Sequence, residues 1–132
     1  MRTRKALATA LGLAAAAVVT PLVTAPPAAA AQWWSYQMHT DDGDPGGRVR
    51  YQPNGDRVQV CDIEADGHRA GVHVYDTVLR AHVDDFAVGT AGKCVTHDAN
   101  DTNLKEGRKY VFTVYLEQGG RVSYTDKSTW KG

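Results

Sequence analysis

Cysteine, basic runs and helical periodicity are all scarce in this sequence. Only two cysteines occur among the 132 residues, Cys61 and Cys94, and their spacing fits no Cys-x-x-Cys zinc pattern. No run of basic residues follows residue 31, so neither nucleic acid nor an anionic membrane is expected as a partner. No window of helical length shows an apolar repeat of 3.6 residues. These absences favour an all-β domain held by at most one disulfide.

The first 31 residues have the composition of an export signal. Three basic residues lie within the first five positions, and residues 7–19 form an apolar, alanine-rich stretch. Alanines at positions 29 and 31 suit signal peptidase, so we expect cleavage after Ala31. Prolines interrupt the apolar stretch, which makes it short for a membrane span of about 20 residues. The sequence therefore predicts a secreted protein that begins at Gln32 and has no membrane association after cleavage.

The expected mature chain is short and slightly acidic. Removing residues 1–31 from 132 leaves 101, enough for one domain with a modest core. The leader holds three of the 15 basic residues and none of the 15 acids, which leaves 12 against 15, a net charge of −3. In an oxidising compartment Cys61 and Cys94 are expected to form a disulfide. Such a bond stabilises a small domain by about 4 kcal/mol. We expect a monomer.

Residues 32–47 are expected to form an arm that precedes the folded domain at 48–132. The first part of the arm is aromatic, and its second part, residues 41–47, is acidic and rich in turn-forming residues. Terminal aromatic side chains serve either as a platform for a ligand or as a cover for their own domain. We favour the second interpretation.

From residue 48 onward, short alternating segments separated by turn residues predict about seven strands. The expected strands are residues 48–51, 57–61, 71–75, 78–83, 93–96, 110–116 and 121–125. In segment 110–116 the residues Tyr110, Phe112, Val114 and Leu116 face one way, and Val111, Thr113 and Tyr115 face the other. In segment 78–83 the apolar side carries Leu79, Ala81 and Val83. This pattern predicts a small immunoglobulin-like β-sandwich.

The approach to the strongest strand resembles the tyrosine corner of immunoglobulin and fibronectin type III domains. Leu104, Gly107 and Tyr110 match that pattern, although Glu106 stands where proline is usual. The resemblance implies that the tyrosine hydroxyl bonds to backbone upstream of the turn. An ordinary glycine turn before a strand is the alternative.

A second resemblance covers most of the mature chain, from about Gly47 to Trp130. The motif Gly-Asp-x4-Cys-Asp-x2-Ala-Asp-Gly, which begins at Gly55, resembles a set of small exported actinobacterial proteins of uncharacterised function. Members often carry a second cysteine pair, but this chain has Tyr115 and Asp126 near those positions. The resemblance implies export and a β domain with one disulfide, and it implies no activity.

An acidic turn follows Cys61 and resembles the start of an EF-hand calcium loop. Asp62, Glu64 and Asp66 alternate, and Gly67 holds the sixth position. Such carboxylates suit Ca²⁺, but the twelfth position is His73 where glutamate is needed, and no helices flank the segment. A polar turn whose carboxylates bond their own backbone is the expected alternative, with no metal.

The histidines and serines show no pattern typical of a metal site or a catalytic site. No histidine has a zinc-motif spacing, and no serine lies in a Gly-x-Ser-x-Gly elbow. Pairing Val74 with Ala81 would place His73 opposite His82, a two-ligand arrangement too small for a strong metal site. Adjacent acids such as Asp84 and Asp85 point to opposite faces of a strand. We therefore expect neither an enzyme nor a cofactor.

The most favoured function is an exported binding or structural module whose partner is an extracellular protein or a cell-wall component. The expected surface is the outward face of strands 71–83 and 110–125, because tyrosine and arginine are frequent at binding hot spots. Its residues are His73, Tyr75, Arg80, His82, Thr113 and Tyr115. A secreted protease inhibitor using loop 97–103, a small hydrolase and a calcium-binding protein are the alternatives.

Overall fold

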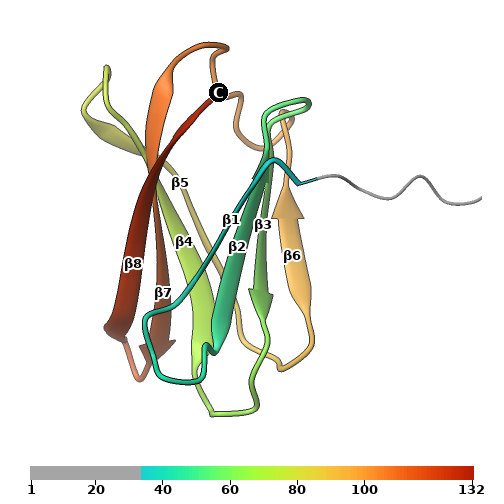
Figure 1. Ribbon diagram of the computed structural model, residues 1–132, viewed down its shortest axis with the longest axis vertical. Helices are drawn as coiled ribbons and strands as arrows, with labels where there is room; N and C mark the ends of the chain where they lie inside the picture. Colours follow the sequence, from blue (N-terminus) through green and yellow to red (C-terminus); the bar gives the residue numbers. More distant parts are fainter. Residues whose placement is uncertain (1–33) are drawn as a thin grey trace, which may run out of the picture. The chain divides into compact units, whose positions relative to one another are not determined.

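Two antiparallel four-stranded sheets face each other in the computed structural model, which describes residues 34–132 (Figure 1). The first sheet has the order β1-β2-β3-β6: β1 (Tyr36–His39), β2 (Gly47–Gln52), β3 (Arg57–Asp62) and β6 (Cys94–His97). The second has the order β5-β4-β7-β8: β5 (Ala81–Val88), β4 (Arg69–Asp76), β7 (Lys109–Gln118) and β8 (Arg121–Lys131). The predicted all-β sandwich is confirmed. The predicted signal at 1–31 lies outside the described residues.

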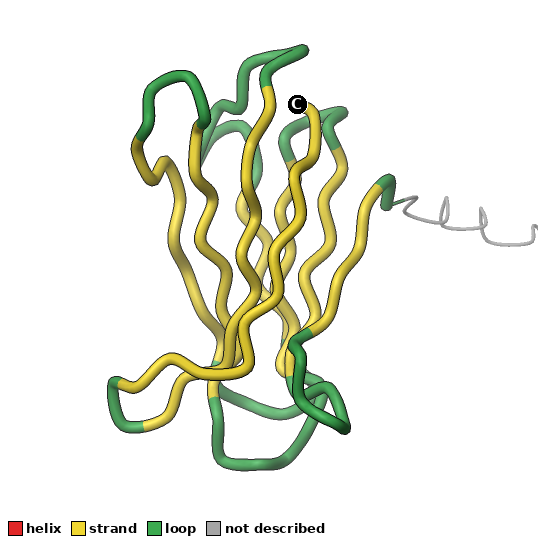
Figure 2. Tube along the Cα trace, turned by 60° about the vertical axis from the view of Figure 1, so that its left-hand side comes forward, coloured by secondary structure: helices red, strands yellow, loops and turns green. Residues whose placement is uncertain are grey.

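The chain passes between the sheets three times, from β3 to β4, from β5 to β6 and from β6 to β7. Sequential strands therefore pair within a sheet only in part, which is the Greek-key connectivity of immunoglobulin-like sandwiches. Loops gather at the two ends of the strands (Figure 2). The faces of the sheets are thus left to strand side chains.

The core lies between the sheets and is built by alternate residues of the central strands. On β7, Tyr110, Phe112, Val114 and Leu116 are all buried, as the alternation predicted. Aromatic rings extend this core, since Phe112 lies 4.8 Å from Tyr51 and 4.7 Å from Trp130 between centroids. Burying one such side chain contributes about 1.5–3 kcal/mol. The opposite face of β7 therefore takes no part in the core between the sheets.

The tyrosine corner is confirmed. The Lys105 backbone N–H donates a hydrogen bond of 2.7 Å to the Tyr110 hydroxyl. Gly107 makes the turn with φ of 75°, a left-handed conformation that favours glycine. The Tyr110 ring is buried, so its hydroxyl needs this partner.

The Cys61–Cys94 disulfide is also confirmed, and it joins neighbouring strands of one sheet. Cys61 on β3 lies directly opposite Cys94 on β6, with 4.0 Å between the Cα atoms. In antibody domains the corresponding bond crosses between the two sheets. Here the bond fixes β6, a four-residue edge strand, to its only partner among the described strands.

Two predicted segments differ from the structure. The segment expected to be an arm contains β1, which pairs along β2 from Tyr36 opposite Tyr51, so the described chain has eight strands. The predicted strand 78–83 is wrong, because residues 77–80 form a turn and β5 begins at Ala81. Asp76 makes that turn by accepting the N–H groups of Val78 and Leu79.

Candidate functional site

Four of the six predicted surface residues lie together on the outer face of the second sheet. His73 and Tyr75 come from β4, His82 from β5 and Tyr115 from β7. Thr113 sits directly opposite His73 on the neighbouring strand and borders this group. Arg80 is not part of it, because it lies in the exposed turn before β5 with φ of 53°.

Tyr115 lies flat across β4 instead of standing out from the sheet. A Cβ atom added to Gly71 would be only 2.3 Å from the Tyr115 Cζ, so the absence of a side chain there makes room for the ring. The hydroxyl reaches β5 and donates to Asp85 Oδ1 at 3.1 Å. The prediction that Tyr115 is an exposed surface residue is therefore wrong, since only 4% of it is accessible.

The Asp85 carboxylate organises two of its neighbours. While Oδ1 accepts from Tyr115, Oδ2 lies 3.0 Å from His73 Nδ1, a contact that becomes an ion pair when the imidazole is protonated. The His73 ring stacks on Tyr115 with centroids 4.4 Å apart. Burial first, and then the negative charge of Asp85, raise the pKa of the Tyr115 hydroxyl, so it remains a donor well into the alkaline range.

Two further rings complete the group. His82 lies edge-on to His73 at 5.4 Å and edge-on to Tyr75 at 5.5 Å between centroids. We call Tyr75, His73, His82, Asp85 and Tyr115 the outer-face cluster. Each ring is positioned by a neighbour in the cluster, so the cluster presents imidazole and phenol edges in fixed positions.

The predicted register between β4 and β5 is wrong, although its consequence survives. A shift between Val74 and Tyr75 places Val74 opposite Asp84 and Tyr75 opposite His82. The turn at 77–80 uses four residues, which moves β5 along β4. His73 and His82 remain neighbours because they now lie diagonally across the strand pair.

Sequence reasoning missed Asp85 and Gly71 as parts of the cluster. The sequence pattern indicates only that Asp85 is one of two adjacent acids that point in opposite directions. Gly71 in the middle of an alternating strand was a usable signal, because a glycine there marks a close approach by another group. No pattern in the sequence indicated which ring would fill the space.

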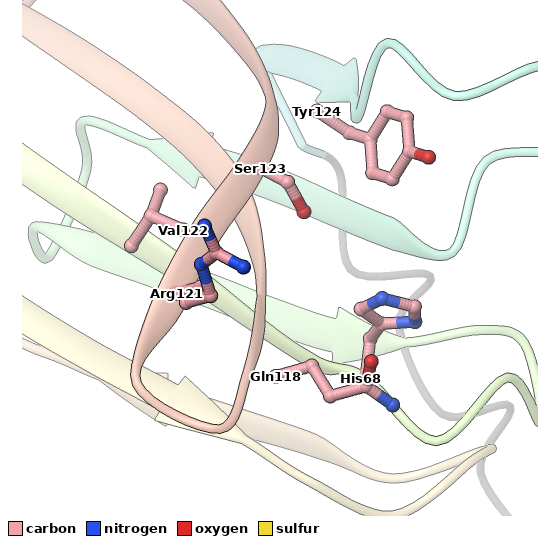
Figure 3. A pocket seen from close by; sticks show the side chains of 6 residues that line it. All are labelled: His68, Gln118, Arg121, Val122, Ser123 and Tyr124. Atoms are coloured by element: carbon pink, nitrogen blue, oxygen red, sulfur yellow. The ribbon is translucent and has the colours of Figure 1, made fainter.

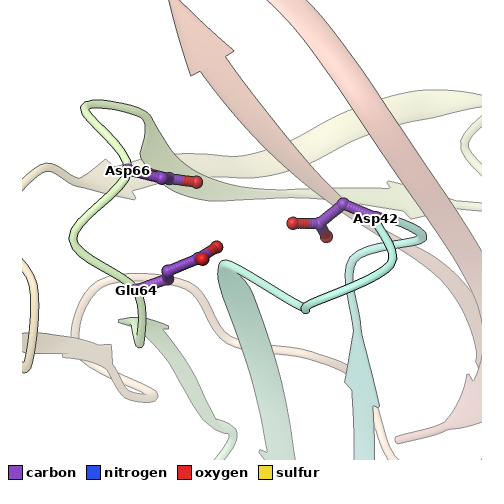
Figure 4. Close-up of side chains that lie close together, drawn as sticks. All are labelled: Asp42, Glu64 and Asp66. Atoms are coloured by element: carbon purple, nitrogen blue, oxygen red, sulfur yellow. The ribbon is translucent and has the colours of Figure 1, made fainter.

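A group of three carboxylates lies at one end of the sandwich. Asp42, Glu64 and Asp66 bring possible ligand oxygens within 4.8 Å of one another, and Figure 4 shows them converging from two loops. Burial and the charges of Asp44, Asp66 and Asp42 raise the pKa of Glu64.

This group differs from the predicted calcium set, and backbone bonds occupy much of it. Asp62 is buried and accepts the N–H of Glu64, so it stands apart. Asp66 accepts the N–H of His68, and Asp42 accepts that of Gly46. Asp42 was missed because residues 41–47 were interpreted as a linker. The arrangement matches the predicted polar turn, in which carboxylates bond their own backbone.

The loop considered for protease inhibition is a compact turn. The backbone N–H groups of Asp101 and Thr102 both donate to the Asp98 carbonyl at 2.9 Å. The Asp98 side chain accepts from the Asn100 N–H, and the Ala99 N–H donates to the Gly55 carbonyl in the β2–β3 turn. The loop is therefore folded on itself, not held as an extended strand.

No family model matches this sequence, and no curated protein matches it. A solved structure of a β-glucuronidase from Parabacteroides merdae is similar at 11% identity and a TM-score of 0.36. The match covers 73% of this chain but only 13% of that enzyme chain. Within residues 34–132 no helix is long and apolar enough to cross a membrane. The function of the chain is therefore inferred from its side-chain geometry.

Proposed function

We propose that this protein is an exported binding module that recognises an extracellular protein or a cell-wall component through the outer-face cluster. The observation that carries the proposal is the mutual ordering of five side chains on the face of the second sheet that points away from the core. These contacts add nothing to the packing between the sheets. Ring contacts, the Tyr115–Asp85 hydrogen bond and the close approach of Asp85 to His73 instead hold functional groups in place.

Pre-ordering of this kind favours binding, because a side chain already fixed loses little conformational entropy when a partner arrives. Tyrosine supplies a large amphipathic contact area with few rotatable bonds. Export is supported by the composition of residues 1–31 and fits a domain that carries a disulfide.

The test is affinity capture from culture supernatant and from cell-wall extract. The wild-type protein and a Tyr75→Ala/His82→Ala double variant are immobilised side by side. Gln37→Ala, an exposed position on β1 in the other sheet, is the matched control. The proposal expects a fraction that the wild type and the control retain and the double variant loses.

Equal retention by all three proteins would show that another surface binds. If the wild-type protein retained nothing from the supernatant and nothing from the cell-wall extract, a binding role would be contradicted. Circular dichroism of the three proteins must agree for the comparison to count.

A further inference from the structure

A hollow of about 390 Å³ opens beside the β7–β8 hairpin, away from the outer-face cluster. Figure 3 shows the side chains that surround it, which come from the end of β7, the beginning of β8 and the loop before β4. The lining residues are His68, Gln118, Arg121, Val122, Ser123 and Tyr124. Only Val122 is aliphatic, so the hollow is a polar recess with one aromatic wall.

Tyr124 is held in a backbone conformation that does not suit it. Its φ is 49°, in the left-handed region where a bulky residue is an outlier. It lies in the bulge where β8 pairs irregularly with β7, between Ser123 opposite Leu116 and Asp126 opposite Val114. Bulges commonly redirect a side chain. Here the Asp41 N–H fixes the bend by donating to the Tyr124 carbonyl at 3.2 Å.

The fold gains little from a tyrosine at this position. Tyr124 is 52% exposed, and its ring lies at a steep angle to the His68 ring, with 6.5 Å between centroids. Glycine or asparagine would adopt the same backbone at lower cost. Strained backbone of this kind clusters at active sites and ligand clamps, which makes the exposed Tyr124 ring a candidate for contact with a ligand.

Hydrogen-bonding groups line the same recess as this ring. The Arg121 guanidinium, the Ser123 hydroxyl and the Gln118 amide line the recess with N–H and O–H donors. His68 is oriented by Asp66, whose Oδ2 lies 3.2 Å from its Nδ1. The lining itself contains no carboxylate, so a ligand rich in acceptor oxygens fits better than a cationic one.

We propose that this recess binds a sugar ring of an extracellular glycan. A sugar offers an apolar C–H face for stacking on Tyr124 and several hydroxyl oxygens for Gln118, Arg121 and Ser123. The volume suits a ligand of one or two rings, since small-molecule sites begin at about 300 Å³. A proline-rich peptide would instead need a groove lined by several aromatic side chains, which this recess does not supply. Like the proposed function, this proposal rests on export of the chain, but it does not depend on recognition by the outer-face cluster.

The test is an NMR titration with two defined saccharides, the neutral N-acetylglucosamine trimer and the acidic galacturonic acid trimer. An acetylated proline-rich peptide forms the third arm. We expect the amide signals of Gln118, Ser123 and Tyr124 to shift with at least one trimer and not with the peptide. The trimer that binds more tightly shows whether Arg121 meets a carboxylate or a neutral acceptor.

Tyr124→Gly separates binding from folding. Glycine adopts positive φ freely, so this variant should melt at the wild-type temperature or above it. Its dissociation constant for the saccharide should rise about tenfold or more. Arg80→Gly is the matched control, since Arg80 is also exposed with positive φ but lies in the β4–β5 turn, at the other end of β4 from His68. It should bind as the wild type does.

Three results would overturn the glycan site. The first is equal affinity of Tyr124→Gly and the wild type for the saccharide. The second is a shift of the amide signals with the peptide alone. The third is no shift of these signals with either trimer at about 10 mM, a concentration that reveals even millimolar affinity. The Tyr75→Ala/His82→Ala variant should still bind the saccharide, so failure of the outer-face proposal does not affect this outcome.

Discussion

Asp84 and Asp85 are neighbours on β5, and each faces a histidine, yet the two pairs occupy different environments. Asp84 points to the inner side, where both its oxygens lie 3.0 Å from Nδ1 of His97 on β6, in the other sheet. Asp85 points outward to His73. The Asp84 side chain is 8% accessible, whereas that of Asp85 is 54% accessible.

The difference shows that the role of an aspartate–histidine pair depends on the face of the strand on which it lies. The inner pair connects the two sheets at the edge where β5 meets β6, and Phe86 stacks on the His97 ring at 3.7 Å between centroids. The outer pair connects nothing between the sheets and instead orders rings on a surface. Inner substitutions should therefore alter stability, and outer substitutions should alter recognition.

The largest expected effect comes from the inner face of β7. Tyr110→Ala removes a buried ring and leaves a cavity, which should lower the free energy of unfolding by about 3–5 kcal/mol. Tyr110→Phe removes only the acceptor of the Lys105 N–H and should cost about 1–3 kcal/mol. Urea denaturation measures both. Val111→Ala on the outer face is the control, and if it proved more damaging than Tyr110→Ala, the assignment of the faces would be wrong.

Asp84→Ala should rank next. It deprives His97 of its partner inside the edge of the sandwich, and the loss of a largely buried hydrogen bond costs about 1–3 kcal/mol. Asp85→Ala should cost less than Asp84→Ala, although it removes the acceptor of the Tyr115 hydroxyl, because the carboxylate is 54% exposed and water can replace it as the acceptor. Thermal melts of the two variants make the comparison, and equal destabilisation would contradict the distinction between the pairs.

Gly71→Ala should move the Tyr115 ring off β4, since the new methyl group meets it. Overpacking of this kind costs about 1–3 kcal/mol. The cost should largely disappear in a Tyr115→Ala background, because the two residues compete for one space. A double-mutant cycle in urea measures this coupling, and simple additivity would mean that the ring does not depend on Gly71.

The smallest effect at neutral pH concerns the Tyr115 hydroxyl. Its pKa is raised in the folded protein, first by burial and then by Asp85, so the stability it contributes is present below about pH 10 and is lost as pH rises above it. Tyr115→Phe should therefore lose less stability than the wild type between neutral and strongly alkaline pH. Melts across that range decide this, and parallel losses would refute the role of the hydroxyl.

Local alternation was enough to predict much of this architecture. It predicted the inward set on β7 and the opposite directions of Asp84 and Asp85. The turn before Tyr110 was predicted by the resemblance to a tyrosine corner. Alternation failed at segment 78–83, where Leu79, Ala81 and Val83 alternate with polar residues. Leu79 instead lies exposed in a turn whose backbone N–H groups bond to Asp76.

The remaining errors arise from contacts between distant segments. The ring of Tyr115 is buried only because Gly71 on β4 makes room and Asp85 on β5 binds its hydroxyl, which requires three strands in register. The composition of β1 predicts part of an arm, because its pairing along β2 is not visible in that composition. Both features depend on spatial neighbours that the sequence pattern does not specify.

The most direct test is an NMR titration. The fraction that the immobilised protein retains from supernatant or cell wall is added to free protein, and the histidine ring signals are followed. His73 and His82 report on the outer-face cluster, and His97 reports on the contact between the sheets. We predict that the ring signals of His73 and His82 shift or broaden while those of His97 stay in place. Movement of His97 with no change at His73 and His82 would contradict the assignment of binding to the outer face.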